Sequence, residues 1–289
     1  MGQISQADLK KLPDIDEPMA FRDVTELAEL LLTPAIWDDN ASTTGNKPSQ
    51  DWDLSCGWDG AVEMLAHGWA AGAEKIQRLQ MASGFSIAPR RKLDRNVSGF
   101  LPCVGAAMAG DPRAMFTRPK KPMRTPVVNL VFNQCANSNV DAAYFENAGV
   151  ACLSLVSTLE SMGVSVGLYV GYTIMGTNYG DGGRKSGIVR WEVPVKRPGQ
   201  PLDIERLAFL VAHPAMFRRI GFAYIERLTL EARKWLGSGY GKSCNHKVIV
   251  ADGHLLPELA EDTDAYETPA KAIETVLAWW ATTVKTLNL

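Results

Sequence analysis

The sequence predicts an α/β protein, with a layered and mostly parallel sheet preceded by an N-terminal extension of helices and loops. From residue 125 onward, short apolar runs alternate with amphipathic helical segments in the order β-α-β-β-α-β-α. The 289 residues are 46% hydrophobic and 21% charged, which is an ordinary globular composition and excludes a collagen-like fibre or a coiled-coil rod. We therefore divide the chain into an extension, residues 1–124, and an α/β domain, residues 125–289.

The extension has few regular segments. Residues 25–37 have helical spacing that Pro34 ends early. Residues 38–51 are polar and rich in turn formers, so we expect a mobile linker, or a segment that only a partner orders. Residues 59–79 predict one amphipathic helix of about five turns, whose glycines indicate a bend or a closely packed neighbouring backbone. Residues 83–125 predict loop with one short helix at most.

The predicted elements of the α/β domain follow from periodicity and from turn residues. They are a buried strand at 125–132, a helix at 141–163, a strand at 164–174, a glycine-rich turn at 176–187, an edge strand at 188–196 containing Pro194, a helix that Asp203 caps and Pro214 interrupts and that continues to 233, a buried strand at 246–253, and a helix that begins at Pro269.

Charge is unevenly placed along the chain. Residues 1–60 carry 12 acidic and 4 basic side chains, whereas residues 81–125 carry 9 basic and 2 acidic ones. Such blocks are typical of solvated faces, and the basic block is also a candidate surface for an anionic partner. The candidate nucleic-acid-binding residues are Arg90, Arg91, Lys92, Arg95, Arg118, Lys120, Lys121 and Arg124. Because no helix with a basic face is evident, we expect sequence-tolerant binding that favours single strands over duplex.

Other features of the sequence exclude several classes of protein. No apolar run approaches the eighteen or so residues that a membrane span needs, and the N-terminus has no apolar core like that of a signal peptide. The five cysteines form no CxxC pair, which favours reduced thiols over a disulfide framework or a zinc ribbon. The Gly241-Lys242-Ser243 run follows a helix and precedes a strand, the reverse of a phosphate-binding loop.

Polar residues follow two of the predicted buried strands, at the edge where open α/β sheets bind ligands. They are the run from Asn133 to Ser138 and the run Asp252-Gly253-His254. With the element order, these residues resemble the von Willebrand factor A fold, in which strand-end residues hold a divalent ion. The resemblance places Asn133, Cys135, Asn137 and Asp252 at the ligand positions, and Thr173 or Thr177 at the position of a middle threonine.

The candidate ligands depart from that family's pattern. The first loop supplies no carboxylate, and cysteine is a soft ligand that suits a hard cation poorly. We therefore expect a degenerate site, with no tight divalent-ion binding and no cofactor. A nucleophile-and-base pair of Cys135 and His254 would need the two side chains to be adjacent in space.

Segments spread over residues 57–226 also resemble an uncharacterised family of tailed-bacteriophage proteins; they include GWDGAVEMLAHGWAAG and PLDIERLAFLVAHPAMFRRIGFAYIE. The resemblance implies a phage origin and the host cytoplasm, and it implies no reaction. We expect a non-catalytic accessory protein of phage DNA or RNA metabolism. It would bind nucleic acid, a phage or host protein, or both, and we expect no binding to a membrane. The alternatives are a metal-dependent enzyme or adhesion-type domain that uses Asp252, and a structural assembly protein whose acidic and basic regions make head-to-tail contacts. The sequence leaves the oligomeric state open, with a homo-oligomer as one alternative.

Overall fold

A computed structural model of the chain describes residues 11–38, 40–83, 94–99, 101–117, 126–180, 183–237, 239–259 and 264–287. The largest sheet among these residues has the order β1-β7-β6-β5-β9, with β8 beside β6. Its strands are β1 (Met19–Ala20), β5 (Val127–Asn133), β6 (Ser165–Gly180), β7 (Gly183–Lys196), β8 (Lys242–Ser243) and β9 (Gly253–Leu255). Strand β5 is parallel to β6 and to β9, and β1 is parallel to β7, whereas β6 is antiparallel to β7 and β8. The predicted fold class, α/β with a mostly parallel sheet, is confirmed.

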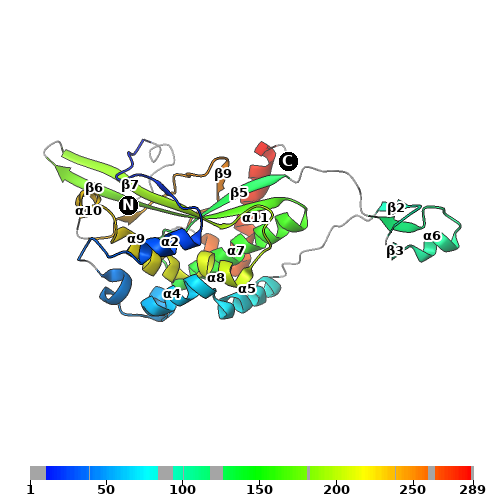
Figure 1. Cartoon of the computed structure of the whole chain (residues 1–289), viewed down its shortest axis with the longest axis horizontal. Coiled ribbons are helices and arrows are strands. Elements are labelled where there is room, and N and C mark those ends of the chain that lie inside the picture. Colours follow the sequence, from blue (N-terminus) through cyan, green and yellow to red (C-terminus); the bar gives the residue numbers. More distant parts are fainter. Residues whose placement is uncertain are drawn as a thin grey trace.

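Helices gather along one side of this sheet (Figure 1). The helical elements are α2 (Val24–Leu31), the π-helical turn η1 (Ala41–Gly45), α3 (Gln50–Asp53), α4 (Gly57–His67), α5 (Ala70–Ala82), α7 (Ala142–Ser161), α8 (Ile204–Ala212), the π-helical turn η2 (Met216–Gly221), α9 (Phe222–Ile225), α10 (Leu230–Leu236), the 3-10 turn η3 (Asp264–Tyr266) and α11 (Pro269–Leu287). No helix of the described residues is long and apolar enough to cross a membrane.

One hydrophobic core joins the sheet to the helices of both halves of the chain. Leu130 and Phe132 of β5 are buried in the same cluster as Leu27 of α2 and Ile76 of α5. The core therefore does not divide at residue 125, because the first eighty residues supply part of the apolar layer that covers the sheet.

The helix predicted over residues 59–79 is two helices, α4 and α5, that meet at Gly68. Gly68 has a φ of 88°, and a Cβ atom there would lie 2.9 Å from the backbone carbon of Glu205 at the start of α8. The Trp69 amide donates a 2.9 Å hydrogen bond to the carbonyl of Glu205. Both meanings assigned to the glycines, a bend and a close backbone contact, are confirmed at this residue.

The region between α5 and β5 holds a small unit, residues 94–117, that the sequence did not predict beyond its short helix. Strands β2 (Asp94–Asn96), β4 (Met115–Thr117) and β3 (Leu101–Pro102) form an antiparallel sheet in that order, with α6 (Val104–Met108) beside it. We call this unit the outer module, since Figure 1 shows it apart from the main body.

The glycine-rich turn expected at 176–187 is largely strand. Strand β6 continues to Gly180 and β7 begins at Gly183, and the two pair along almost their whole length. The edge position expected for β7 is correct only in part. Strand β1 pairs with Trp191 and Glu192, and Pro194 follows where no further strand of the described residues adds to β7.

The expectation of a mobile linker at residues 38–51 is wrong for its described part. Ser42 is fully buried, and η1 and the start of α3 lie within the segment. The carboxylate of Glu226 accepts hydrogen bonds from the Ser42 amide, at 3.0 Å, and from the Ser42 hydroxyl, at 2.5 Å. Ser42 thus fastens an otherwise largely exposed polar segment to the helical layer.

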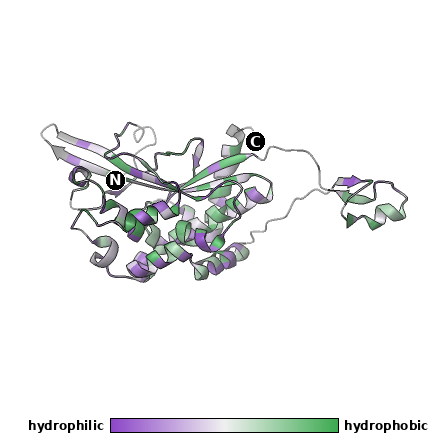
Figure 2. Ribbon diagram, viewed as in Figure 1, coloured by the Kyte–Doolittle hydropathy of each residue, from purple (hydrophilic) through white to green (hydrophobic). Residues whose placement is uncertain are grey.

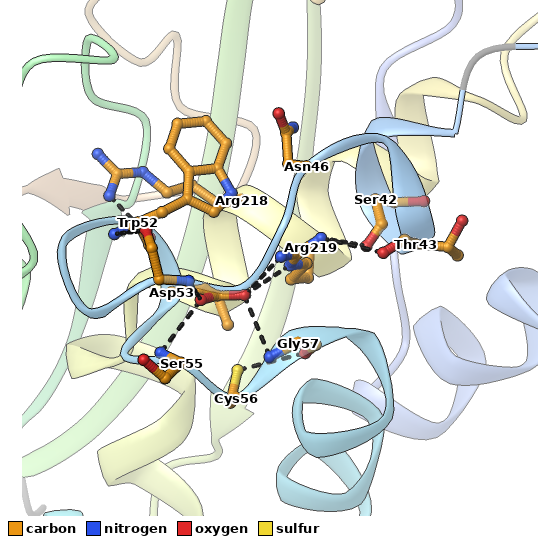
Figure 3. A network of polar contacts seen from close by, with 12 residues as sticks. Ser42, Thr43, Asn46, Trp52, Asp53, Ser55, Cys56, Gly57, Arg218 and Arg219 are labelled. Carbon is orange, nitrogen blue, oxygen red and sulfur yellow. Dashed lines mark hydrogen bonds and ion pairs between the residues drawn. The ribbon is translucent and has the colours of Figure 1, made fainter.

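A buried ion pair between Asp53 and Arg219 fastens the same segment to the helical layer (Figure 3). The Arg219 guanidinium donates to Asp53 Oδ2 at 2.6 and 2.8 Å and also to the carbonyls of residues 41, 42 and 43. Asp53 in turn accepts the amides of Ser49, Ser55 and Gly57 at 3.0 to 3.1 Å. Both side chains are completely buried, so their charges are satisfied only by each other and by backbone groups.

Candidate functional site

The carboxyl end of β5 is the first place where predicted site residues lie. Asn133 ends β5 and is almost fully buried, and its amide nitrogen donates to the Cys244 carbonyl at 3.2 Å. Its side-chain oxygen accepts the amide of Cys135, whose sulfur accepts the Thr173 amide at 3.2 Å. Burial raises the pKa of the Cys135 thiol well above its usual range, so this cysteine is a packed thiol and not an activated nucleophile. Asn137 lies at the exposed rim, where its side-chain oxygen accepts the Ser243 hydroxyl at 2.6 Å.

Asp252 lies away from these residues. The strand expected at 246–253 is wrong, because residues 244–250 are irregular and β9 begins only at Gly253. Gly253 pairs with Asn129, four residues before Asn133 along β5, which separates the two ends by about 13 Å. Asp252 therefore precedes the last strand of the sheet instead of following it.

The pair of Cys135 and His254 is likewise not brought together. His254 pairs in register with Leu130, in the middle of β5, whereas Cys135 follows the end of that strand. Thr173 lies within β6 next to Cys135, and Thr177 lies farther along the same strand. Of the residues that the von Willebrand A resemblance named, the structure thus places Asn133, Cys135 and Thr173 together and leaves Asp252 outside.

The acidic residue at the carboxyl end of β9 is Glu258, which the sequence analysis did not single out. Its carboxylate accepts the His246 amide at 2.6 Å and shares a side-chain hydrogen bond with Asn133. Burial raises its pKa from 4.5 to about 7, against the opposing effect of those hydrogen bonds. Among the residues of this region, Glu258 is therefore a group whose charge changes near neutral pH.

Glu258→Gln is expected to remove one step from the pH dependence of stability. Between pH 4.5 and 7 the folded chain holds a proton on Glu258 that the unfolded chain has released, so the free energy of unfolding falls as the pH rises through this window. Urea unfolding across the window measures the effect, and Glu274→Gln, at an exposed position, is the matched control. Equal pH profiles for the wild type and Glu258→Gln would contradict this assignment.

A second polar group lies beneath the irregular segment 244–250, on the face of the sheet away from Tyr172 and the core. His246 Nδ1 lies 2.5 Å from the Thr173 hydroxyl, and its Nε2 lies 2.8 Å from Glu192 Oε1. Burial lowers the pKa of His246, so we treat the ring as neutral, accepting from Thr173 and donating to Glu192.

The order of hydroxyl, imidazole and carboxylate resembles a catalytic triad, but its geometry serves packing. Thr173, His246 and Glu192 are each at most 2% exposed, which leaves no path for a substrate. Glu192 also accepts the amides of Ile249 and Val250 at 2.5 and 2.8 Å. The group therefore holds residues 244–250 against the sheet, since each polar atom already has a partner.

Most of the predicted basic residues lie outside the described residues. Arg90, Arg91, Lys92, Arg118, Lys120, Lys121 and Arg124 belong to residues 84–93 and 118–125, of which the structure describes nothing. Arg95 is described, on β2 of the outer module, where it pairs with Asp111 at 3.3 Å. Asp111 also accepts the Arg113 amide at 2.8 Å, and this hydrogen bond is the main cause that lowers the pKa of Asp111.

The two ends of the outer module lie next to each other. Asp94 pairs with Thr117 in the β2–β4 ladder, so the chain leaves the module at neighbouring points on both sides. Phe116, the partner of Arg95 in the same ladder, is half-buried.

The outer module also presents an apolar surface. Four large apolar side chains are exposed, while Ala106 is its one buried hydrophobic residue among those described. The exposed residues are Val97, Leu101, Val104 and Met108, of which Met108 is 85% exposed. Figure 2 shows the hydrophobic colouring over α6. A unit of this size buries too little to be stable by itself, so this surface is suited to a partner.

The chain was compared with protein families, curated proteins and solved structures. A family model described as a domain of unknown function (DUF7192) matches residues 15–283, which is most of the chain. No curated protein and no solved structure matches the sequence.

Proposed function

This chain belongs to the DUF7192 family, and we propose that it is a non-catalytic binding protein that contacts nucleic acid through the outer module and the basic stretches beside it. Two observations carry the proposal. Residues 81–125 contain 9 basic and 2 acidic residues, and β2 pairs with β4 within this region. Asp94 and Thr117, which are partners in the β2–β4 register, are the described residues next to the two basic stretches of the sequence.

The rest of the molecule supports a binding role over a catalytic one. The polar groups at the end of β5 and beneath residues 244–250 are engaged in hydrogen bonds that hold loops in place. The resemblance to tailed-bacteriophage proteins supports a role in phage DNA or RNA metabolism in the host cytoplasm. A metal-dependent function of Asp252 is less well supported, because Asp252 and Asn133 lie at different ends of the strands that carry them.

A mobility-shift titration tests this function. We expect the full chain to shift a labelled single-stranded oligonucleotide at low salt and to lose affinity steeply at moderate salt, because phosphate contacts release counterions. Changing Arg90, Arg91, Lys120 and Lys121 together to alanine should abolish most of the shift. The matched control changes Arg22, Lys47, Arg206 and Lys271, four exposed cations of the main body, to alanine.

Two outcomes would contradict the proposal. One is no shift at low salt, and the other is a shift that the fourfold module variant retains in full. A duplex of the same sequence, titrated in parallel, shows whether single strands are preferred.

A second candidate function, structural assembly, is favoured by the exposed apolar surface of the outer module. In that case the module docks on another protein molecule, and the chain is a homo-oligomer or part of a larger assembly. Sedimentation of the chain without nucleic acid separates the two functions. An oligomer that Met108→Asp dissociates, together with no mobility shift, would favour assembly.

A further inference from the structure

The outer halves of β6 and β7 form a two-stranded ribbon, residues 176–180 with 183–187, that projects from the main body (Figure 1). Strand β8 pairs with β6 only at Ile174 and Met175, and Asp14 bridges β7 only at Ile188. In the described part of the chain no other strand adds to the ribbon. An isolated two-stranded ribbon is only marginally stable in water, so we looked for contacts that stabilise this one.

The base of the ribbon is held tightly on both sides. A Cβ atom on Gly176 would lie 2.7 Å from the Trp235 carbonyl oxygen, and one on Gly187 would lie 2.7 Å from Cγ1 of Ile15. Neither position has room for a side chain, so the ribbon leaves the body in a fixed direction. Such anchoring preorganises the residues that follow it.

The composition of the ribbon suits a polar and anionic ligand. Its sequence, GTNYGDGGRKSG over 176–187, contains no large aliphatic residue, and Tyr179 is its one aromatic residue. The register pairs Asn178 with Lys185 and Thr177 with Ser186, and Lys185 is exposed. Two basic residues stand against one acidic residue in this stretch of the sequence.

A groove of about 540 Å³ lies at the base of the ribbon, between β6 and the segment after α10. Its lining includes Thr177, Asn178, Lys234, Trp235 and Lys242, with backbone from three glycines of the 237–241 stretch. Lys234 is paired with Glu231 at 2.6 Å, so its charge is partly balanced. The groove thus combines a partly exposed aromatic residue, lysines and glycine backbone.

We propose that this groove and the ribbon bind one nucleotide of a single-stranded nucleic acid, with the base against Trp235 and the phosphate near Lys242 and Lys185. This inference rests on the proposed function and adds a second contact to it, on the opposite side of the main body from the outer module in Figure 1. Stacking of bases on aromatic side chains, combined with lysine contacts to phosphate, is how sequence-tolerant single-strand binding is built.

Fluorescence anisotropy with a labelled oligothymidylate tests the groove. We expect Trp235→Ala to lower affinity roughly tenfold and Trp235→Phe to keep most of it, because phenylalanine still stacks. Changing Lys242 and Lys185 together to alanine should lower the slope of log affinity against log salt by about 1, because both lysines contact one phosphate. Lys271→Ala, on α11, is the matched control, and thermal midpoints show that each variant folds.

Each outcome separates the two proposals. If the groove variants bind like the wild type while the fourfold module variant loses binding, the groove inference is wrong and the proposed function stands. If the module variant keeps binding that Trp235→Ala removes, the groove is the main contact and the module is not. If the wild type binds no oligonucleotide, both are wrong. Competition by thymidine monophosphate at equal concentration would show a site for free nucleotides instead of a strand.

Discussion

Replacing Asp53 by alanine is expected to lower the free energy of unfolding by roughly 3–5 kcal/mol, because it leaves the Arg219 guanidinium buried without its counterion. The same change removes the acceptor of three amides, those of Ser49, Ser55 and Gly57. Leu54 and Ser55 have φ values of 52° and 61°, a left-handed conformation that costs about 1 kcal/mol or more per residue. Without the Asp53 carboxylate, this strain is opposed by fewer hydrogen bonds, among them the one from the Ser55 amide to the Ser49 carbonyl.

Urea unfolding measures the Asp53→Ala effect. Arg22→Ala, which removes an exposed pair with Glu26, is the control and should cost less than about 1 kcal/mol. We also expect residues 40–57 to become the first site of proteolysis in the Asp53 variant. A loss no larger than that of the control would show that the buried pair does not hold the segment.

Glu192→Ala is expected to cost about 3 kcal/mol or more, because one carboxylate accepts hydrogen bonds from His246, Ile249 and Val250. Glu192→Gln keeps an acceptor of the same size and should cost clearly less. Thermal unfolding of the two variants measures the difference. Equal losses would mean that the segment 244–250 is held by its apolar contacts and not by this carboxylate.

Some elements could be predicted from local sequence because their signals lie within a few residues. Helix α8 begins after Asp203, whose carboxylate accepts the Arg206 amide at 3.2 Å, as its position before an apolar stripe indicates. Helix α2 ends before Pro34, and β5 coincides with the apolar run after Pro126. In these elements propensity, capping and burial all favour the same structure.

The features that sequence reasoning missed depend on distant partners. Asp53 and Arg219 are 166 positions apart, so nothing local marks residues 40–57 as ordered. The apolar run before Asp252 resembles a buried strand, but its backbone hydrogen bonds with the Glu192 side chain instead of with a neighbouring strand. Glu258 carries no motif of its own, although an acidic residue just after a strand of a parallel sheet was a signal that could have been used.

The central claim is that positive charge beside the outer module binds a phosphate backbone, and the salt dependence of binding tests it most directly. Anisotropy of a labelled single-stranded oligonucleotide is measured over a range of salt concentrations for the full chain and for the variant with Arg90, Arg91, Lys120 and Lys121 changed to alanine. We predict a linear fall of log affinity with log salt for the wild type, and a slope reduced by about 3 to 4 in the variant. Identical slopes, or no binding at the lowest salt concentration, would contradict the claim.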